Sequence, residues 1–243
     1  MNCAATVLAV SLAVSLAVTA ACGARNPADV PVVPPSKIMD FNFLYARNCS
    51  GCHGAEGKGG AAIGIGDPVY LAIADDSAIG RVTSDGVAGT SMPAFAQHSG
   101  GALSDEQINV IVHGIRTRWA KPDALSGTIA PPYAAETPGD AKRGATAYMA
   151  FCSACHGADG RGSKRASSIV DASYLGLVSD QNLRTMVIVG RPELGAPDWR
   201  SDIPGHPMSP QEVSDVVAWM VAQRVQFPGQ PYSSALRIEG GIR

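Results

Sequence analysis

The fold of this chain is decided by the stretch Cys49-Ser-Gly-Cys52-His53-Gly-Ala-Glu-Gly-Lys-Gly59, because the stretch occurs twice. It reappears 103 residues later as Cys152-Ser-Ala-Cys155-His156-Gly-Ala-Asp-Gly-Arg-Gly162. The cysteines, the histidine, most of the glycines and the order of charges are kept. Such self-similarity at a fixed distance is the signature of an internal repeat. The sequence therefore predicts two related units that arose by duplication.

Each repeat also carries the patterns of two helices. A capping box precedes an amphipathic pattern at 104–107 in the first repeat and at 209–212 in the second. Shorter helices are predicted before the cysteine pairs, at 41–48 and 141–151. Because alternating strand patterns are missing, the predicted fold class is all-α, with two tandem small domains that each have an N-terminal and a C-terminal helix.

An apolar run and two proline-rich stretches set the predicted domain boundaries. The apolar run ends in small residues, as a signal peptidase requires, and proline-rich segments favour extended tethers. The predicted organisation is a signal peptide at 1–21, a proline-rich tether at 22–37, a first domain at 38–120, a proline-rich linker at 121–139, a second domain at 140–226 and a C-terminal tail at 227–243.

The N-terminal segment predicts export. Cys22 directly follows the small residues, which is where a bacterial lipoprotein carries its lipid-modified cysteine. Plain cleavage and a retained membrane anchor are the two alternatives. We expect an exported, periplasmic protein that lipid on Cys22 attaches to the membrane.

The charge balance excludes one class of partner. The chain has 19 Lys and Arg against 21 Asp and Glu, for a formal net charge of -2. A protein that holds nucleic acid presents a basic field to the phosphates. Nucleic acid is therefore not expected as a partner.

The chemistry lies in the Cys-x-x-Cys-His motif. Two thiols spaced in this way can add to both vinyl groups of a haem, and the adjacent imidazole then binds the iron. A disulfide would not need the histidines, and a four-cysteine zinc site would not explain one pair in each repeat. The sequence predicts two covalently bound haem c groups, attached through Cys49, Cys52, Cys152 and Cys155, with His53 and His156 as axial ligands.

The second axial ligand must come from a later loop. Met92 lies on a proline- and glycine-flanked loop 39 residues after His53, and its soft thioether sulfur suits the iron. His98 and His113 are weaker alternatives, because one lies in a polar loop and the other on the predicted terminal helix. Met92 is the predicted sixth ligand of the first haem.

The second repeat departs from this pattern. Aligned on the capping serines, Ala196 occupies the place of the methionine, and alanine cannot bind iron. Met208, next to the capping serine, is the first choice for the sixth ligand. The alternatives are His206, Met186 and an iron without a sixth protein ligand.

At these residues the sequence resembles the class I cytochromes c, specifically the dihaem kind made of tandem units. The resemblance covers residues 38–226 and rests on both cysteine-histidine motifs, on Met92 and on the two capped helices. It implies two small α-helical haem domains and electron transfer. A looser similarity, at 190–200 and 215–219, is to cytochrome c subunits of bacterial quinol-oxidising or terminal-oxidase complexes.

The expected function is therefore one-electron transfer in a bacterial respiratory or photosynthetic chain, at the outer face of the cytoplasmic membrane, without an enzymatic reaction. The expected partners are redox proteins: a quinol-oxidising complex, a terminal oxidase or a dehydrogenase. Two alternatives remain: a haem enzyme, such as a peroxidase or an oxidoreductase subunit, and a gas-binding or structural subunit. Both would use an open second iron.

The repeats also predict how their helices pack. Aligned positions pair Phe41 with Gly114 in the first repeat and Gly144 with Trp219 in the second, so large faces small in both. The resemblance implies that the first and last helices cross at such a pair, and close-packed interiors require complementary volumes. We expect contact within each pair.

Overall fold

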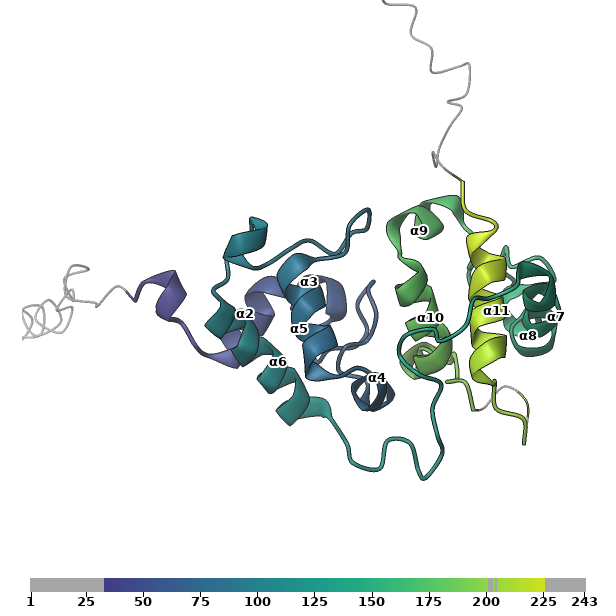
Figure 1. The fold of residues 1–243 in the computed structure, drawn as a ribbon, viewed down its shortest axis with the longest axis horizontal. Helices are drawn as coiled ribbons and strands as arrows, with labels where there is room; N and C mark the ends of the chain where they lie inside the picture. Colours follow the sequence, from purple (N-terminus) through teal and green to yellow (C-terminus); the bar gives the residue numbers. More distant parts are fainter. Residues whose placement is uncertain (1–32, 201–202, 204, 226–243) are drawn as a thin grey trace, which may run out of the picture. The chain divides into compact units, whose positions relative to one another are not determined.

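The computed structural model describes residues 33–200, 203 and 205–225. Among these residues there is no β-strand, which confirms the predicted all-α fold (Figure 1). The elements in chain order are η2 (Pro35–Lys37), α2 (Phe41–Asn48), α3 (Ser50–His53), α4 (Pro68–Ile73), α5 (Asp76–Asp85), η3 (Gln97–Ser99), α6 (Asp105–Trp119), α7 (Ala141–Phe151), α8 (Ser153–His156), α9 (Ala172–Leu177), α10 (Asp180–Val189), η4 (Pro192–Leu194) and α11 (Pro210–Val221).

The two halves repeat one helical plan. The predicted helices before the cysteines are α2 and α7, with the predicted bounds, and both predicted capping boxes are formed, by Ser104 and Gln107 and by Ser209 and Glu212. A capping box satisfies two backbone N–H groups at a helix start that have no partner within the helix. Local sequence therefore determines where the last helix of each repeat begins.

In the first repeat, α2 crosses α6 at the predicted pair. A methyl group built on Gly114 would overlap Cγ and Cδ2 of Phe41. The ring of Phe41 therefore lies directly on the glycine, and the predicted contact is confirmed. Helix α6 turns Ile108, Ile111 and Ile115 toward the core, where all three are buried.

In the second repeat, α7 and α11 lie side by side (Figure 1). A methyl group built on Gly144 would lie 2.8 Å from Cβ of Trp219 and would overlap the carbonyl oxygen of Asp215. The predicted contact between Gly144 and Trp219 is thus confirmed. The closest approach, however, is made by the α11 backbone rather than by the indole ring.

The two tryptophans that end up near the cysteine motifs come from different positions of their helices. Trp219 stacks on Tyr148, with ring centroids 4.0 Å apart, and Trp119 lies edge-on to Tyr45, with centroids 5.0 Å apart. Such aromatic pairs add to the stability of a core beyond the area they bury. Alignment of the repeats on their capping serines matches Trp219 with Gly114 and does not identify Trp119.

The chain divides into two units, with the boundary between Lys37 and Ile38. Both predicted haem domains fall in the second unit, and their boundaries stay a prediction. Of the predicted tether, the structure describes only residues 33–37, within which Pro35–Lys37 forms a short 3-10 helix. The predicted signal peptide, Cys22 and the tail at 227–243 lie outside the described residues. No helix within the described residues combines the length and the apolar character needed to cross a bilayer.

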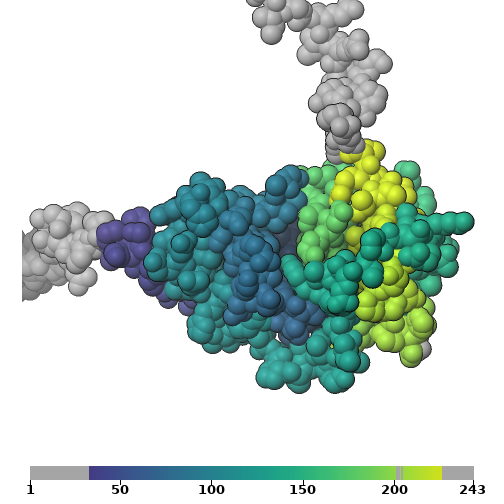
Figure 2. Space-filling model, viewed as in Figure 1, coloured from purple at the N-terminus to yellow at the C-terminus, as the bar shows by residue number. Residues whose placement is uncertain are grey.

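The linker is held on the surface of the second repeat (Figure 2). Arg184 of α10 donates hydrogen bonds to the carbonyl oxygens of Pro132 and Tyr133, and Gln211 of α11 donates one to the carbonyl oxygen of Pro138. These bonds fasten a segment that has no helix or strand of its own.

Candidate functional site

Each Cys-x-x-Cys-His motif forms a single helical turn. The first cysteine is the N-cap of the turn and the histidine is its last residue, in both α3 and α8. None of the four motif cysteines, Cys49, Cys52, Cys152 and Cys155, forms a disulfide. Since neither pair is closed as a disulfide, both thiols of each motif remain available for thioether bonds to a haem.

The two histidines are held in the same way. Nδ1 of His53 lies 2.8 Å from the carbonyl oxygen of Ile63, and Nδ1 of His156 lies 2.8 Å from that of Ser167. A hydrogen bond of this kind selects the tautomer with the proton on Nδ1 and leaves Nε2 free to bind a metal. Burial also lowers the pKa of His53 below its ordinary value, although the bond to Ile63 opposes this. Burial thus favours the neutral imidazole of His53 that iron requires, and the Nδ1 contact selects the tautomer whose Nε2 can bind the iron.

A tyrosine supports the loop after each motif. Tyr45 donates a 2.8 Å hydrogen bond to the carbonyl oxygen of Gly54, and Tyr148 donates one to that of Gly157. Each tyrosine stands four residues before the first cysteine of its motif. Neither tyrosine is part of the Cys-x-x-Cys-His pattern, so neither was predicted, although their equal spacing in the two repeats is a signal that could have identified them.

The loop that carries Met92 is closed by backbone contacts. Helix α5 ends at Gly86, which has a φ of 67°, and the N–H of Val87 donates a 3.0 Å hydrogen bond to the carbonyl oxygen of Met92. A side chain on Gly86 would come within 2.6 Å of the carbonyl carbon of Pro93. Glycine is thus required here both by the left-handed conformation and by the close approach of the loop.

The second repeat closes the corresponding loop in the same way. Helix α10 ends at Gly190, also with a φ of 67°, and the N–H of Arg191 donates a 2.9 Å hydrogen bond to the carbonyl oxygen of Ala196. A side chain on Gly190 would come within 2.5 Å of the carbonyl carbon of Pro197. Ala196 therefore occupies the backbone position of Met92, as the sequence alignment indicated.

The two alternative histidines of the first repeat have other partners. The ring of His98 is exposed, with Nε2 3.5 Å from Asp85 and Nδ1 3.4 Å from Asp105. His113 is exposed on α6, and its Nε2 lies 3.3 Å from the hydroxyl of Thr117. Both histidines are engaged with neighbouring polar groups at the surface.

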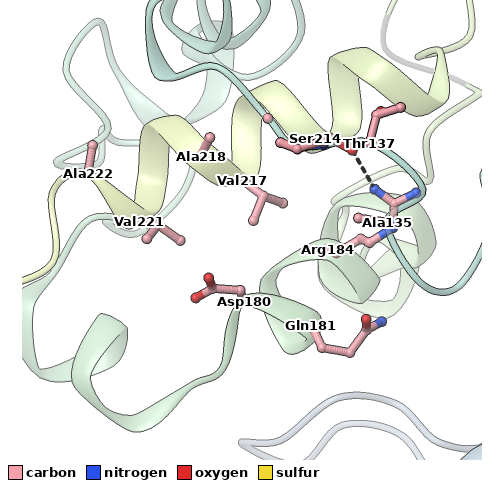
Figure 3. Close-up of a pocket in the computed structure, with 12 residues that line it drawn as sticks. Ala135, Thr137, Asp180, Gln181, Arg184, Ser214, Val217, Ala218, Val221 and Ala222 are labelled. Carbon is pink, nitrogen blue, oxygen red and sulfur yellow. Dashed lines mark hydrogen bonds between the residues drawn. The ribbon is translucent and has the colours of Figure 1, made fainter.

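A groove of about 470 Å³ lies elsewhere, between the linker, α10 and α11 (Figure 3). The buried guanidinium of Arg184 reaches Ser214 across it, with a 3.0 Å hydrogen bond. None of the predicted haem residues lines this groove. The groove is therefore separate from both predicted haem sites.

The residues present fit covalent haem. Each repeat offers two cysteines that form no disulfide and an imidazole whose Nε2 is presented by a fixed Nδ1 contact. Within the described part of the chain, no group of three His, Cys, Asp or Glu residues is arranged to hold a metal ion directly.

Comparison with protein families assigns both repeats. Residues 37–113 match the family described as cytochrome C oxidase, cbb3-type, subunit III, and residues 141–223 match the family described as cytochrome c. The chain is a dihaem class I cytochrome c. The two cytochrome c domains imply two covalently bound haem c groups, and the pairs Cys49/Cys52 and Cys152/Cys155 fit their attachment.

Among solved structures, this cytochrome is similar to a chain of the Kuenenia stuttgartiensis reducing HAO-like protein complex Kustc0457/Kustc0458. The identity is 17%, the match covers 80% of this chain and 100% of that chain, and the TM-score is 0.46. A similarity of this size adds nothing to the family assignment. No curated relative matches the sequence.

Proposed function

We propose that this dihaem cytochrome is a one-electron carrier in a bacterial respiratory or photosynthetic chain, at the outer face of the cytoplasmic membrane. The observation that carries the proposal is the matched pair of anchors, in which His53 and His156 present Nε2 through identical Nδ1 contacts of 2.8 Å. Two similar haem anchors in one chain suit the passage of an electron between two redox partners.

The residues of the first repeat support a carrier. Met92 supplies the sixth ligand, and methionine opposite histidine raises the reduction potential of a haem. The Met92 loop is closed by a hydrogen bond at each side of the methionine, because its N–H donates to the hydroxyl of Thr90 and its carbonyl oxygen accepts from Val87. These bonds fix the backbone from which the Met92 side chain would reach the iron, and a ligand on a fixed backbone would keep the reorganisation on electron transfer small.

An electron carrier makes and breaks no substrate bond. When bound, the haem supplies the redox chemistry, and the protein contributes ligands, orientation and the exclusion of water. The proposed partners are redox proteins, namely a quinol-oxidising complex, a terminal oxidase or a dehydrogenase. One observation favours the alternative of a haem enzyme or gas-binding subunit, namely that Ala196 stands where the first repeat has its methionine.

A redox titration of the purified haem-loaded chain, followed by its optical spectrum, tests the proposal. We expect two one-electron waves and the near-infrared band of a methionine-ligated ferric haem. The variant Met92→Ala should lose that band, whereas Met39→Ala, at an exposed methionine outside both loops, should keep it. Rapid turnover of hydrogen peroxide with slow electron exchange toward redox proteins would favour the enzyme instead.

We further propose that the chain is exported and carries lipid on Cys22. Haem c is attached outside the cytoplasm in bacteria, so export agrees with the two haem sites. Fractionation of cells that express the full chain should find it with the membrane, and Cys22→Ser should release it. Cys3→Ser, at the other end of the apolar run, is the matched control and should stay with the membrane. Release of neither variant would favour a retained anchor.

A further inference from the structure

The second haem site lacks the side chain that closes the first. Ala196 and Met92 accept equivalent backbone hydrogen bonds, from Arg191 and Val87, behind glycines with the same φ of 67°. The backbone therefore presents the two residues from one position of the loop. A methyl group ends far short of the reach of a thioether and has no lone pair to donate to iron.

In this structure Met208 does not take the position that Met92 holds in the first repeat. Its N–H donates a 2.9 Å hydrogen bond to the carbonyl oxygen of Trp199, just as the N–H of Leu103 donates a 2.8 Å bond to that of Phe95. Met208 is 3% exposed and Leu103 is 6% exposed. Met208 thus fills the core position that leucine fills in the first repeat, directly before the capping serine.

The two remaining alternatives are also placed elsewhere. The ring of His206 stacks on Phe151, with centroids 5.6 Å apart, and its Nε2 lies 3.4 Å from Glu212. Met186 lies on α10 where Val82 lies on α5, since the carbonyl oxygens of both accept the N–H of the glycine that ends the helix. The first repeat needs no ligand from this helix position.

We infer that the iron of the second haem keeps an open sixth position that binds a small neutral diatomic ligand, such as carbon monoxide or nitric oxide. The inference rests on the proposed haem attachment at Cys152 and Cys155. A neutral ligand is favoured because the charged loop residues that the structure describes after Gly190 are paired with one another, Arg191 with Glu193 and Asp198 with Arg200. Asp198 and Arg200 form an ion pair of 2.6 Å, and the guanidinium of Arg200 lies 4.7 Å from the centre of the Trp199 ring.

Carbon monoxide titration of the reduced, haem-loaded chain tests the inference by absorbance. We expect the chain to bind one equivalent of carbon monoxide, so that one of its two haems reacts. The variant Ala196→Met should abolish this uptake and double the near-infrared band of methionine ligation. The matched variant Met92→Ala, at the equivalent position of the first repeat, should raise the uptake to two equivalents.

Three results would overturn the inference. In the first, the unsubstituted chain takes up no carbon monoxide. In the second, its near-infrared band already corresponds to two methionine-ligated haems. In the third, Ala196→Met leaves the uptake of carbon monoxide unchanged. In the first two cases Met208→Ala, His206→Ala and Met186→Ala would identify the protein ligand. The proposed carrier function fails separately, through a missing redox wave or through a chain that carries fewer than two haems.

Discussion

The helix crossings of the two repeats should respond differently to the same substitution, glycine to alanine. In an exposed helix this change stabilises a protein by about 1 kcal/mol, because glycine loses more backbone entropy on folding. At Gly114 the new methyl group would overlap the ring of Phe41, and overpacking of this kind costs about 1–3 kcal/mol. Gly114→Ala should therefore lower the free energy of unfolding by up to about 2 kcal/mol.

The obstacle at Gly114 is a side chain, so removal of that side chain should reverse the effect. In the background Phe41→Ala, the atoms Cγ, Cδ2 and Cε2 that the methyl group would meet are gone. Gly114→Ala should then stabilise by about 1 kcal/mol. Gly80→Ala on α5 is the control for helix propensity, because its methyl group would meet only Cγ2 of Val112, at 3.8 Å.

The obstacle at Gly144 is backbone, so no truncation should relieve it. A methyl group there would overlap the carbonyl oxygen of Asp215, which remains when Trp219 becomes alanine. Gly144→Ala should destabilise the second repeat in both backgrounds, and by more than Gly114→Ala destabilises the first.

Guanidinium unfolding of the haem-loaded variants measures these free energies. Helical circular dichroism follows both repeats, and the near-infrared band of Met92 ligation reports on the first repeat alone. Equal destabilisation by Gly114→Ala with and without the Phe41 ring would refute the reasoning, because the ring would then not be the obstacle. Destabilisation by Gly80→Ala would also refute it, because no close neighbour opposes a methyl group at that position.

Three further outcomes can be measured on the same material. Burial alone would raise the pKa of Asp215, but hydrogen bonds, led by the one from Arg143, hold this pKa below its ordinary value. The resulting stabilisation should be present above about pH 4 and should be lost as the pH falls through the lower pKa of the folded state. Asp215→Asn should remove this pH dependence in acid unfolding followed by circular dichroism. Tyr148→Phe removes the hydrogen bond to the carbonyl oxygen of Gly157 and should cost about 1 kcal/mol in guanidinium unfolding, with no change if that bond is absent in solution. Arg184→Met removes the donors that hold the linker carbonyls, so limited proteolysis should cleave the linker faster than in the unsubstituted chain, and an equal rate would contradict the anchoring.

Features that depend on near neighbours in the sequence were predictable. The capping serines and the short helices before the cysteines follow from residues within one or two turns, and the structure reproduces them. The contact of Phe41 with Gly114 was also predictable, because alignment of the repeats exposes complementary volumes. Contacts that depend on loop length were not. Ile63 lies 10 residues after its histidine and Ser167 lies 11 after its own, so the carbonyl groups that orient the two imidazoles do not align in the sequence.

Trp119 shows a second limit of sequence alignment. It lies 15 residues after its capping serine, whereas Trp219 lies 10 residues after its own. Both indoles nevertheless come close to the glycine four residues after the motif histidine. A side chain built on Gly57 would meet Trp119 at 3.1 Å, and one built on Gly160 would meet Trp219 at 2.9 Å. Three-dimensional packing can fill one space from two different turns of a helix, and no alignment of positions reports this.

The repeats differ in length by one residue at two places, but neither difference explains why the two irons are expected to behave differently. The extra residue between His156 and Ser167 is absorbed in its loop, because the Nδ1 contact is 2.8 Å in both repeats. The other extra residue falls between Trp199 and the capping serine, after the position of the axial methionine. It too is absorbed, because Met208 still takes the core place of Leu103. Neither change in length displaces a ligand position. The difference between the two sites therefore comes down to one side chain, that of Ala196, and a single substitution to methionine should make the second site like the first.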